Sequence, residues 1–368
     1  MSNSIFTIPS DFNVNNLIRL VKENEKLNIK AKEVYGSLKT SAYGSGRKFF
    51  ELPDTTHDNF VQYLAECKKN NICFNYTLNS SCYGNDEFSK EERDRLLSWI
   101  QELVDDGVRQ FTVALPSVIH LLNEAFPEVK VTLSIIIGVD SISKMNCFCQ
   151  YPNINSLYLH ERIYRQHKLV KKLTDIAHEH GKKVGMIVNS FCLSDCPYRM
   201  AHYNYGAHAT MGNEYIIPEY YGSKCALSKI SDLRNVLNAP WVRPDDLETY
   251  MDLGVDRFKI SGREMYNNNA NMLKVLETYN QRKYNGNLVD LFMCFTDCAY
   301  SELFEIKNNQ YLDQYLENVY RGENLCNVNG CTDCGLCKDA LSAIKIKKEG
   351  RDKWTMVFEE RLKNFGKV

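Results

Sequence analysis

The sequence predicts an α/β protein built as a (β/α)8 TIM-type barrel and followed by a C-terminal cysteine-rich extension. Two observations lead to this fold class. Short apolar segments alternate with amphipathic helical segments about eight times over roughly the first 260 residues. No G-x-G-x-x-G motif follows the first apolar segment, which disfavours the runner-up, a doubly wound open sheet.

The apolar segments are interpreted as strands because they are rich in Val, Ile, Tyr and Phe. Most of them are apolar on both faces, which is typical of a parallel sheet covered on both sides. The predicted strands are Ile5–Pro9, Glu33–Leu38, Ile72–Leu78, Gln110–Leu115, Val129–Ile137, Ser156–His160, Lys183–Asn189 and Arg257–Ser261.

Helices are predicted between the strands from their apolar spacing and their end signals. The segment SKEE at Ser89 combines a capping residue with acids in the first turn, and Gly181 and Gly254 follow two helices as stop signals. Pro244 lies in the first turn of the last of these helices, where a missing N–H costs nothing. The predicted helices are Asn13–Lys26, His57–Asn70, Ser89–Asp106, Arg165–His180 and Arg243–Leu253.

The pattern changes after Asn269, so we expect the barrel to end there or soon after. Further helices are predicted over Asn271–Lys283 and Tyr311–Gly322. We divide the chain into a barrel over residues 1–290 and a C-terminal cysteine-rich extension over residues 291–368. No Gly/Ser-rich or Pro-rich linker separates the two parts, so the extension is expected to pack on the barrel.

Composition excludes several classes of protein. The formal net charge is −1, which gives no global attraction to nucleic acid or to an anionic membrane. The N-terminal segment MSNSIFTIPSDF is not a secretory signal, and no apolar stretch is long enough to span a bilayer. We therefore expect a cytoplasmic protein, whose fourteen cysteines stay reduced and do not form a disulfide framework.

The clearest motif is a cysteine quartet near the C-terminus. Cys326, Cys331, Cys334 and Cys337 follow the spacing C-x4-C-x2-C-x2-C. Four thiolates in one short loop suit an iron–sulfur cluster, and zinc is the lesser possibility. The structural alternative is a set of buried free thiols, which such crowding disfavours.

A second cysteine group lies in the middle of the chain. Cys192 and Cys196 form a C-x3-C pair after the seventh predicted strand, and Cys225 follows later. Metal ligation and plain thiols are equally consistent with this spacing. Cys294 and Cys298 form another C-x3-C pair that could supply a missing ligand.

Other candidate residues follow the predicted strands, because TIM barrels collect their functional groups at the carboxyl ends of the strands. A lysine buried at a strand end needs a negatively charged partner or a substrate oxygen. We expect acid–base or charge-stabilising roles for His202, Lys259, Arg263 and Glu264. Substrate contacts are expected for Tyr76, Asn79, Arg199, Asn204 and His208, although loop histidines and arginines also serve as structural groups.

Three segments at these strand ends resemble the peptidase U32 family, also called collagenase-like. They are FNYTLNSSCYGN from Phe74, VNSFCLSDCPYRMAHYN from Val188 and GVDRFKISGRE from Gly254. The resemblance covers about residues 1–270 and implies a TIM-type barrel. It also implies a [4Fe–4S] cluster, with Cys192 and Cys196 as ligands and Cys225 as the third. Several members of the family hydroxylate RNA or ubiquinone precursors without dioxygen.

The sequence departs from the family pattern at two strand ends. Ser261 stands where the family commonly has the acid of FKIEGR, and Ser190 and Phe191 stand where it commonly has NEGC. The C-terminal quartet lies beyond the matched region. The absent carboxylates point to a distinct substrate or to a different catalytic group, such as Glu264 or His202.

Taken together, these features predict an iron–sulfur-dependent modifying enzyme with one or two [4Fe–4S] clusters. Dioxygen-independent hydroxylation of an aromatic or nucleobase-like substrate is the favoured reaction, with a small molecule or RNA as substrate. A ferredoxin or flavodoxin would donate electrons, and the sequence is compatible with an oligomer. The alternatives are a U32-type peptidase and a non-catalytic iron–sulfur partner or redox sensor. No H-E-x-x-H or G-x-S-x-G motif supports proteolysis.

Overall fold

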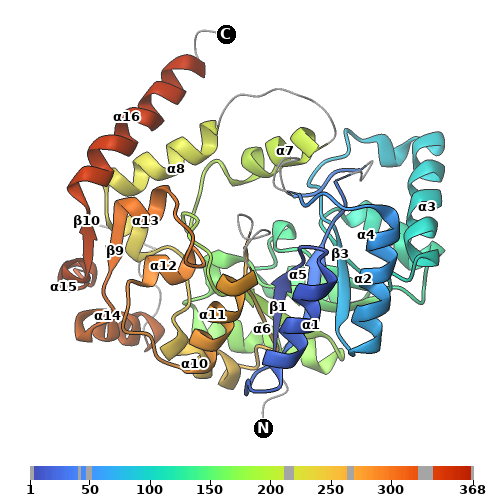
Figure 1. Ribbon diagram of the computed structural model, residues 1–368, viewed down its shortest axis with the longest axis horizontal. Helices are drawn as coiled ribbons and strands as arrows, with labels where there is room; N and C mark the ends of the chain where they lie inside the picture. The colour runs from blue at the N-terminus through green and yellow to red at the C-terminus, as the bar shows by residue number, and fades with distance from the viewer. Residues whose placement is uncertain are drawn as a thin grey trace.

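The computed structural model describes residues 4–39, 43–46, 52–210, 219–262, 269–321 and 335–365. Eight parallel strands pair in chain order, and the eighth closes the barrel on the first (Figure 1). This confirms the predicted TIM-type barrel and all eight predicted strand positions. The strands are β1 (Ile5–Pro9), β2 (Ala31–Gly36), β3 (Cys73–Leu78), β4 (Gln110–Val113), β5 (Lys130–Leu133), β6 (Ile154–Tyr158), β7 (Lys183–Ile187) and β8 (Arg257–Lys259).

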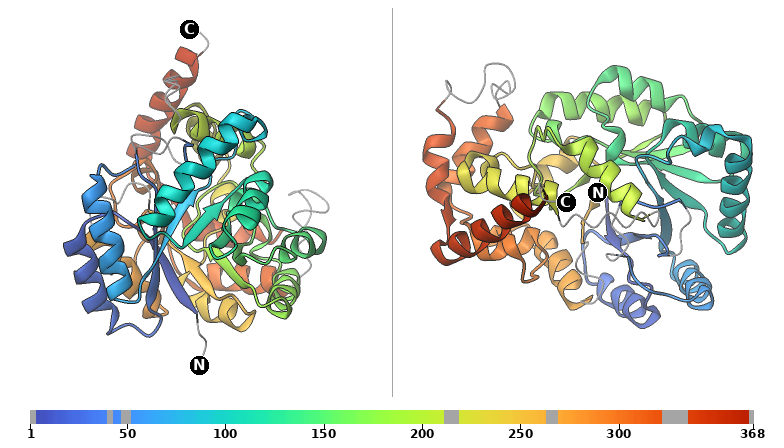
Figure 2. Two further views of the ribbon diagram at one scale, coloured as in Figure 1. Left: turned by 90° about the vertical axis from the view of Figure 1, so that its right-hand side faces the viewer. Right: turned by 90° about the horizontal axis from the view of Figure 1, so that it is seen from above.

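Helices surround the barrel and join successive strands (Figures 1 and 2). The five helices predicted within the barrel are present, and the side chain of Ser89 caps its helix as expected. The last of them is divided into a short 3-10 turn over Pro244–Asp246 and α10. The helices are α1 (Val14–Asn24), α2 (His57–Lys69), α3 (Lys90–Asp105), α4 (Pro116–Ala125), α5 (Ile142–Cys149), α6 (His167–Glu179), α7 (Arg199–Thr210), α8 (Tyr220–Ser231), α9 (Arg234–Leu237), α10 (Leu247–Asp252) and α11 (Asn269–Asn280).

The C-terminal part packs on one side of the barrel, where its helices lie next to α8 (Figure 2). It contains α12 (Leu288–Phe292), α13 (Ala299–Leu303), α14 (Gln310–Arg321), α15 (Cys337–Ala340) and α16 (Lys348–Phe365), with a small antiparallel sheet of β9 (Phe304–Ile306) and β10 (Ile344–Ile346). Helix α12 spans residues 290 and 291, where the division into two parts was predicted. No helix in the described parts of the chain is long and apolar enough to cross a membrane.

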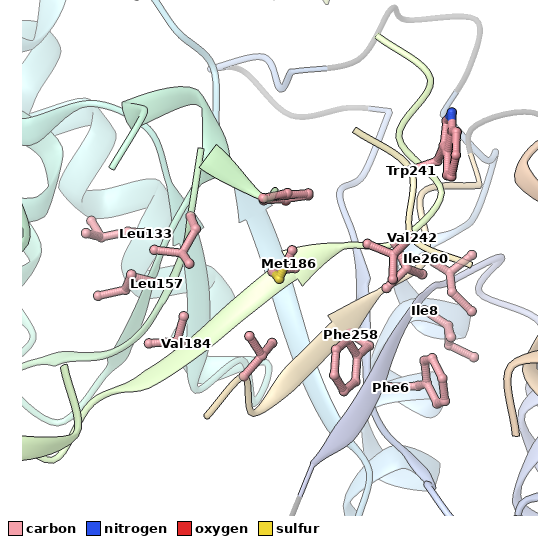
Figure 3. Close-up of a cluster of buried hydrophobic side chains, with 14 of the residues drawn as sticks. Phe6, Ile8, Leu133, Leu157, Val184, Met186, Trp241, Val242, Phe258 and Ile260 are labelled. Carbon is pink, nitrogen blue, oxygen red and sulfur yellow. The ribbon is translucent and has the colours of Figure 1, made fainter. Parts of the chain in front are cut away.

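The outer face of the barrel strands forms the main hydrophobic core (Figure 3). Phe6, Met186 and Phe258 point away from the barrel axis toward the helices and are fully buried. Alternate residues along each strand face opposite sides, so the next residue along each of these strands faces the barrel interior. The helices therefore cover a continuous apolar surface.

The inner face is polar, so the expectation of strands apolar on both faces is wrong. Glu33 and Arg257 form a buried ion pair inside the barrel. Gln110 donates to Glu33 over 2.8 Å, and Asn75 donates to the other oxygen of the same carboxylate over 3.2 Å. Thr132 accepts from both amides. Because buried charges need partners, this network fixes the relative positions of the strands that contribute to it.

Gly185 in β7 is required by the close approach of a barrel side chain. A Cβ atom at this position would lie 2.6 Å from Cε1 of Tyr158. We expect Gly185→Ala to lower the free energy of unfolding by about 1–3 kcal/mol, because it overpacks the barrel interior. Urea unfolding measures the loss. Gly206→Ala is the control, since its nearest neighbour would lie at 3.9 Å, and an unchanged stability of Gly185→Ala would contradict the packing.

His167 at the start of α6 should make stability depend on pH. Burial lowers the pKa of its imidazole to about 4, and the nearby Asp246 carboxylate offsets only part of this effect. The ring stacks on Tyr320 with the two centroids 4.0 Å apart. Between about pH 6.5 and pH 4, the unfolded chain binds a proton at this position and the folded chain does not. Stability is therefore lost as the pH falls through this window.

His167→Phe keeps the ring stacking and removes this titration. As the pH falls from 7 to 4.5, we expect the wild-type protein to lose about 1–2 kcal/mol more of its unfolding free energy than the variant loses. Chemical unfolding at several pH values measures it. Parallel pH profiles for the two proteins would show that His167 does not contribute.

Candidate functional site at the carboxyl ends of the strands

The two mid-chain cysteine segments meet at one side of the barrel mouth. Cys192 and Cys196 lie in the loop that follows β7, and Cys225 lies in α8. The pKa of Cys192 is raised to about 11, mainly because the surrounding protein shields its thiol from water and secondly because the Glu161 carboxylate is close. Part of the residue is nevertheless exposed at the surface. Burial also raises the pKa of Cys196, and Cys225 contributes to both increases. The fold therefore brings the three predicted ligands into one neighbourhood.

A buried ion pair fixes the loop that carries Cys192 and Cys196. Arg199, the first residue of α7, pairs with Glu161, which follows β6. Its other nitrogen donates to the carbonyl of Leu193 over 2.7 Å and to that of Ser194. The predicted substrate-binding residue Arg199 thus holds the C-x3-C loop against the barrel.

Glu161 also places a carboxylate next to Ser190, at one of the two positions where the sequence lacks the expected acid. The hydroxyl of Ser190 donates to Glu161, and both residues are buried. This carboxylate comes from the loop after β6, whereas the acid of the family pattern would come from the loop after β7. The contact of Glu161 with Ser190 was not predicted from the sequence, because only the folded barrel brings these two loops together.

Asn189 connects the ends of β7 and β8 to the C-terminal part. Its amide accepts from the backbone nitrogen of Ser261 over 2.7 Å and donates to the carbonyl oxygens of Ser261 and Phe292. It also donates to the sulfur of Cys294 over 3.3 Å. Cys294 is buried at this junction, so its contacts indicate a structural role.

An ammonium group and a hydroxyl group are directed at the sulfur of Cys225. The ammonium of Lys229, one helical turn later in α8, donates to its sulfur over 2.7 Å. The hydroxyl of Tyr300 in α13 also points to this sulfur, at 3.7 Å. The C-terminal part therefore contributes directly to the surroundings of the mid-chain cysteines.

Lys259 ends β8 at the barrel mouth, as predicted. Its ammonium lies 3.6 Å from the ring centre of Tyr35 and 5.3 Å from that of Tyr158. The hydroxyls of Thr7 and Tyr158 lie near each other, but neither makes a hydrogen bond of normal geometry within the described residues. The ammonium of Lys259 and two hydroxyl groups that could bond to a substrate thus lie in the barrel near the carboxyl ends of its strands.

The remaining predicted site residues within the described parts of the chain do not lie at one common position. His202 stacks on Tyr221 at 5.5 Å, and Asn204 accepts a hydrogen bond from Ser81, so α7 lies over the loop after β3. His208 is half-buried near the end of α7. Asn79 accepts from the backbone nitrogen of Gly46. Tyr76 is fully buried among the aromatic rings outside the barrel, which places it in the core and away from the mouth.

Several predicted residues lie outside the described residues. They are Arg263, Glu264, Cys326, Cys331 and Cys334. Cys337 is described and is buried at the start of α15. Within the described residues, no three His, Cys, Asp or Glu side chains are already spaced to hold a metal ion.

A cavity of about 340 Å³ borders the outer side of the C-x3-C loop. The lining includes Leu193, Ser194, Asp195 and Pro197 of this loop, together with Asp232 and Arg234. Glu161 also contributes to the lining, so one partner of the ion pair that fixes the loop borders this cavity.

The closed barrel, with charged residues and thiols at the carboxyl ends of its strands, defines a TIM-barrel protein of the kind that carries its site at this face. The chain is 29% identical over 346 residues to the Uncharacterized protease MJ1657 of Methanocaldococcus jannaschii, covering 92% of this chain and 98% of the relative. The barrel resembles the solved U32 peptidase Mk0906 with a TM-score of 0.51 and 16% identity, covering 71% of this chain and 94% of that one.

No family model matches the chain. The relative that covers most of the chain and the U32 barrel nevertheless support the resemblance of this chain to the U32 peptidase family.

Proposed function

We propose that this protein is an iron–sulfur-dependent modifying enzyme. Its reaction would be dioxygen-independent hydroxylation, or related redox chemistry, on an aromatic or nucleobase-like substrate. The observation that carries the proposal is the meeting of Cys192, Cys196 and Cys225 beside the barrel mouth, where TIM-barrel enzymes hold their substrates. The reaction is expected to take place in the cytoplasm.

The three thiols fit an iron–sulfur cluster by their chemistry. Thiolates are the ligands that iron–sulfur clusters prefer, and three of them would leave one iron open to a substrate or to a fourth ligand. Since the thiols are not already spaced for a metal ion within the described residues, the segments that carry them would rearrange when a cluster binds. When bound, the cluster would supply one-electron transfer.

The protein's own residues would bind and orient the substrate. Lys259 and the hydroxyls of Thr7 and Tyr158 offer a positive charge and two hydrogen-bonding groups to an anionic or carbonyl-bearing substrate. Arg199 and Glu161 would hold the cysteine loop in place. His202 remains the proposed proton carrier, with His208 and Asn204 on the same helix as substrate contacts.

The C-terminal quartet is proposed to hold a second cluster, or zinc as the lesser possibility. A second cluster would exchange electrons between the first cluster and a ferredoxin or flavodoxin, which would take up the two electrons that hydroxylation by water releases. Changing Cys334 and Cys337 together to serine distinguishes two arrangements. Two separate clusters predict that iron is lost in part, whereas one shared cluster predicts that it is lost entirely.

Peptidase activity is the alternative that the names of the two similar proteins suggest. A thiol protease needs a cysteine whose pKa is lowered, since the thiolate is the nucleophile. Burial has the opposite effect on Cys192 and Cys196, because it raises both pKa values. The alternative of a non-catalytic redox sensor predicts a cluster but no product.

The test is to incubate the oxidised holoprotein, without dioxygen, with total RNA and with small aromatic acids in the presence of a one-electron dye as acceptor. The acceptor is needed because hydroxylation with water as the oxygen source releases two electrons for each oxygen atom gained. Mass spectrometry would then follow the gain of one oxygen atom, and a gel assay with casein would follow cleavage. We expect oxygen gain that depends on Cys192 and Cys196, and no cleavage. Casein cleavage that survives serine at both cysteines would contradict the proposal and favour the peptidase.

A further inference from the structure

Lys229 is a fully buried lysine whose surroundings contain little to balance its charge. It lies in α8 and is 0% exposed. Within the described residues its polar partner is the sulfur of Cys225, 2.7 Å away. Its other neighbours are the rings of Phe191 and Tyr300, with centroids at 5.6 Å and 5.4 Å, and no carboxylate there lies within ion-pair distance.

Such an environment is unfavourable for an ammonium next to a neutral thiol. Removing the charge from water is costly unless another charge or strong hydrogen bonds offset the loss. Two aromatic faces offset only part of this cost. The remaining cost indicates that the environment is suited to a negatively charged sulfur group.

The charge of Lys229 also reaches the other two mid-chain cysteines. Its charge acts on both Cys192 and Cys196, in the sense that favours their thiolates. Phe191 directly precedes Cys192, and Tyr300 donates toward Cys225, so the residues around Lys229 come from both cysteine segments and from α13. One buried cation thus contacts Cys225 and acts electrostatically on Cys192 and Cys196.

We propose that Lys229 is the positioning and charge-balancing residue of this cysteine site. Its ammonium donates to the sulfur of Cys225 and offsets the negative charge of a thiolate-held iron–sulfur cluster. The inference rests on the proposed function. Positive charge and hydrogen bonds to the sulfurs stabilise the reduced form of a cluster, which has one more negative charge, so Lys229 raises the reduction potential.

The experiment compares Lys229→Met with the wild-type holoprotein after anaerobic reconstitution. Methionine keeps the length of the side chain and removes the charge. In a redox titration followed by electron paramagnetic resonance, we expect the ratio of reduced to oxidised cluster to fall at least about tenfold at a fixed potential. For a one-electron couple this corresponds to a shift of about 59 mV toward lower potential.

Two further variants serve as controls. Lys229→Arg keeps the charge and should stay close to the wild-type potential. Lys224→Met removes the same charge from the same helix, but its ammonium lies over Tyr220, 5.7 Å from the ring centre, so its shift should be much smaller. If Lys229→Met does not retain a cluster, Lys229→Gln provides the same comparison, since it also removes the charge.

The outcomes separate this inference from the proposed function. An unchanged potential in a Lys229→Met protein that holds its cluster overturns the inference alone. An equal shift in Lys224→Met also overturns it, because the effect would then depend on net charge and not on the contact with Cys225. A wild-type protein that takes up no iron overturns the proposed function, and the inference fails with it.

Discussion

Replacing Cys192 and Cys196 together with serine is expected to remove the cluster at the barrel mouth. Serine is similar in size to cysteine, but its hydroxyl is a hard ligand that does not replace a thiolate on iron. Even the loss of a group that only supports a metal ligand lowers metal affinity about 10–100-fold. Loss of two ligands should exceed this, so iron at this site should fall to background and product formation with it.

Iron and sulfide analysis of the anaerobically purified variant measures this loss. Cys147→Ser is the matched control, because Cys147 is an exposed thiol on α5 and belongs to neither cysteine group. Circular dichroism separates loss of the cluster from loss of the fold. Full iron content in the double variant would mean that Cys192 and Cys196 are not ligands.

The second large effect is expected inside the barrel, where Arg257→Met would leave the Glu33 carboxylate without its charged partner. Glu33 is 1% exposed, so it cannot recover the lost interaction from water. Breaking a buried ion pair by removing one partner typically costs about 3–5 kcal/mol. We expect a loss of this size in the free energy of unfolding, measured by urea denaturation.

A double-mutant cycle tests whether this loss comes from the unpaired charge. Glu33→Gln combined with Arg257→Met removes both charges and keeps an acceptor for Asn75 and Gln110. The double variant should therefore be more stable than Arg257→Met alone. If the stability losses of Glu33→Gln and Arg257→Met simply add in the double variant, the ion pair does not stabilise the barrel interior.

The barrel was predictable because its strands and helices alternate in a regular way. The polar interior was not predicted, although part of its signal is visible in the sequence. In β3 and β4, polar residues alternate with apolar ones, as in Asn75 and Thr77 or Gln110 and Thr112. The high content of Val, Phe and Tyr in the strands obscured this alternation.

The candidate site was predictable where chemistry follows from spacing, as for Cys192 and Cys196, or from a strand end, as for Lys259. Glu161 and Lys229 were missed because their roles depend on contacts between distant loops. In sequence, Glu161 is an acid near a predicted strand and Lys229 is a lysine in a helix. Only folding shows that both are buried, one beside Arg199 and the other beside Cys225.

The most direct measurement is iron and acid-labile sulfide per chain in the wild-type protein, purified and kept without dioxygen. A [4Fe–4S] cluster at the barrel mouth predicts iron and sulfide in equal amounts, near four of each per chain, or near eight if the quartet holds a second cluster. Serine at Cys192 and Cys196 should then remove about four. Protein that contains no iron and sulfide, even after anaerobic reconstitution, would contradict the proposal that this barrel is an iron–sulfur enzyme.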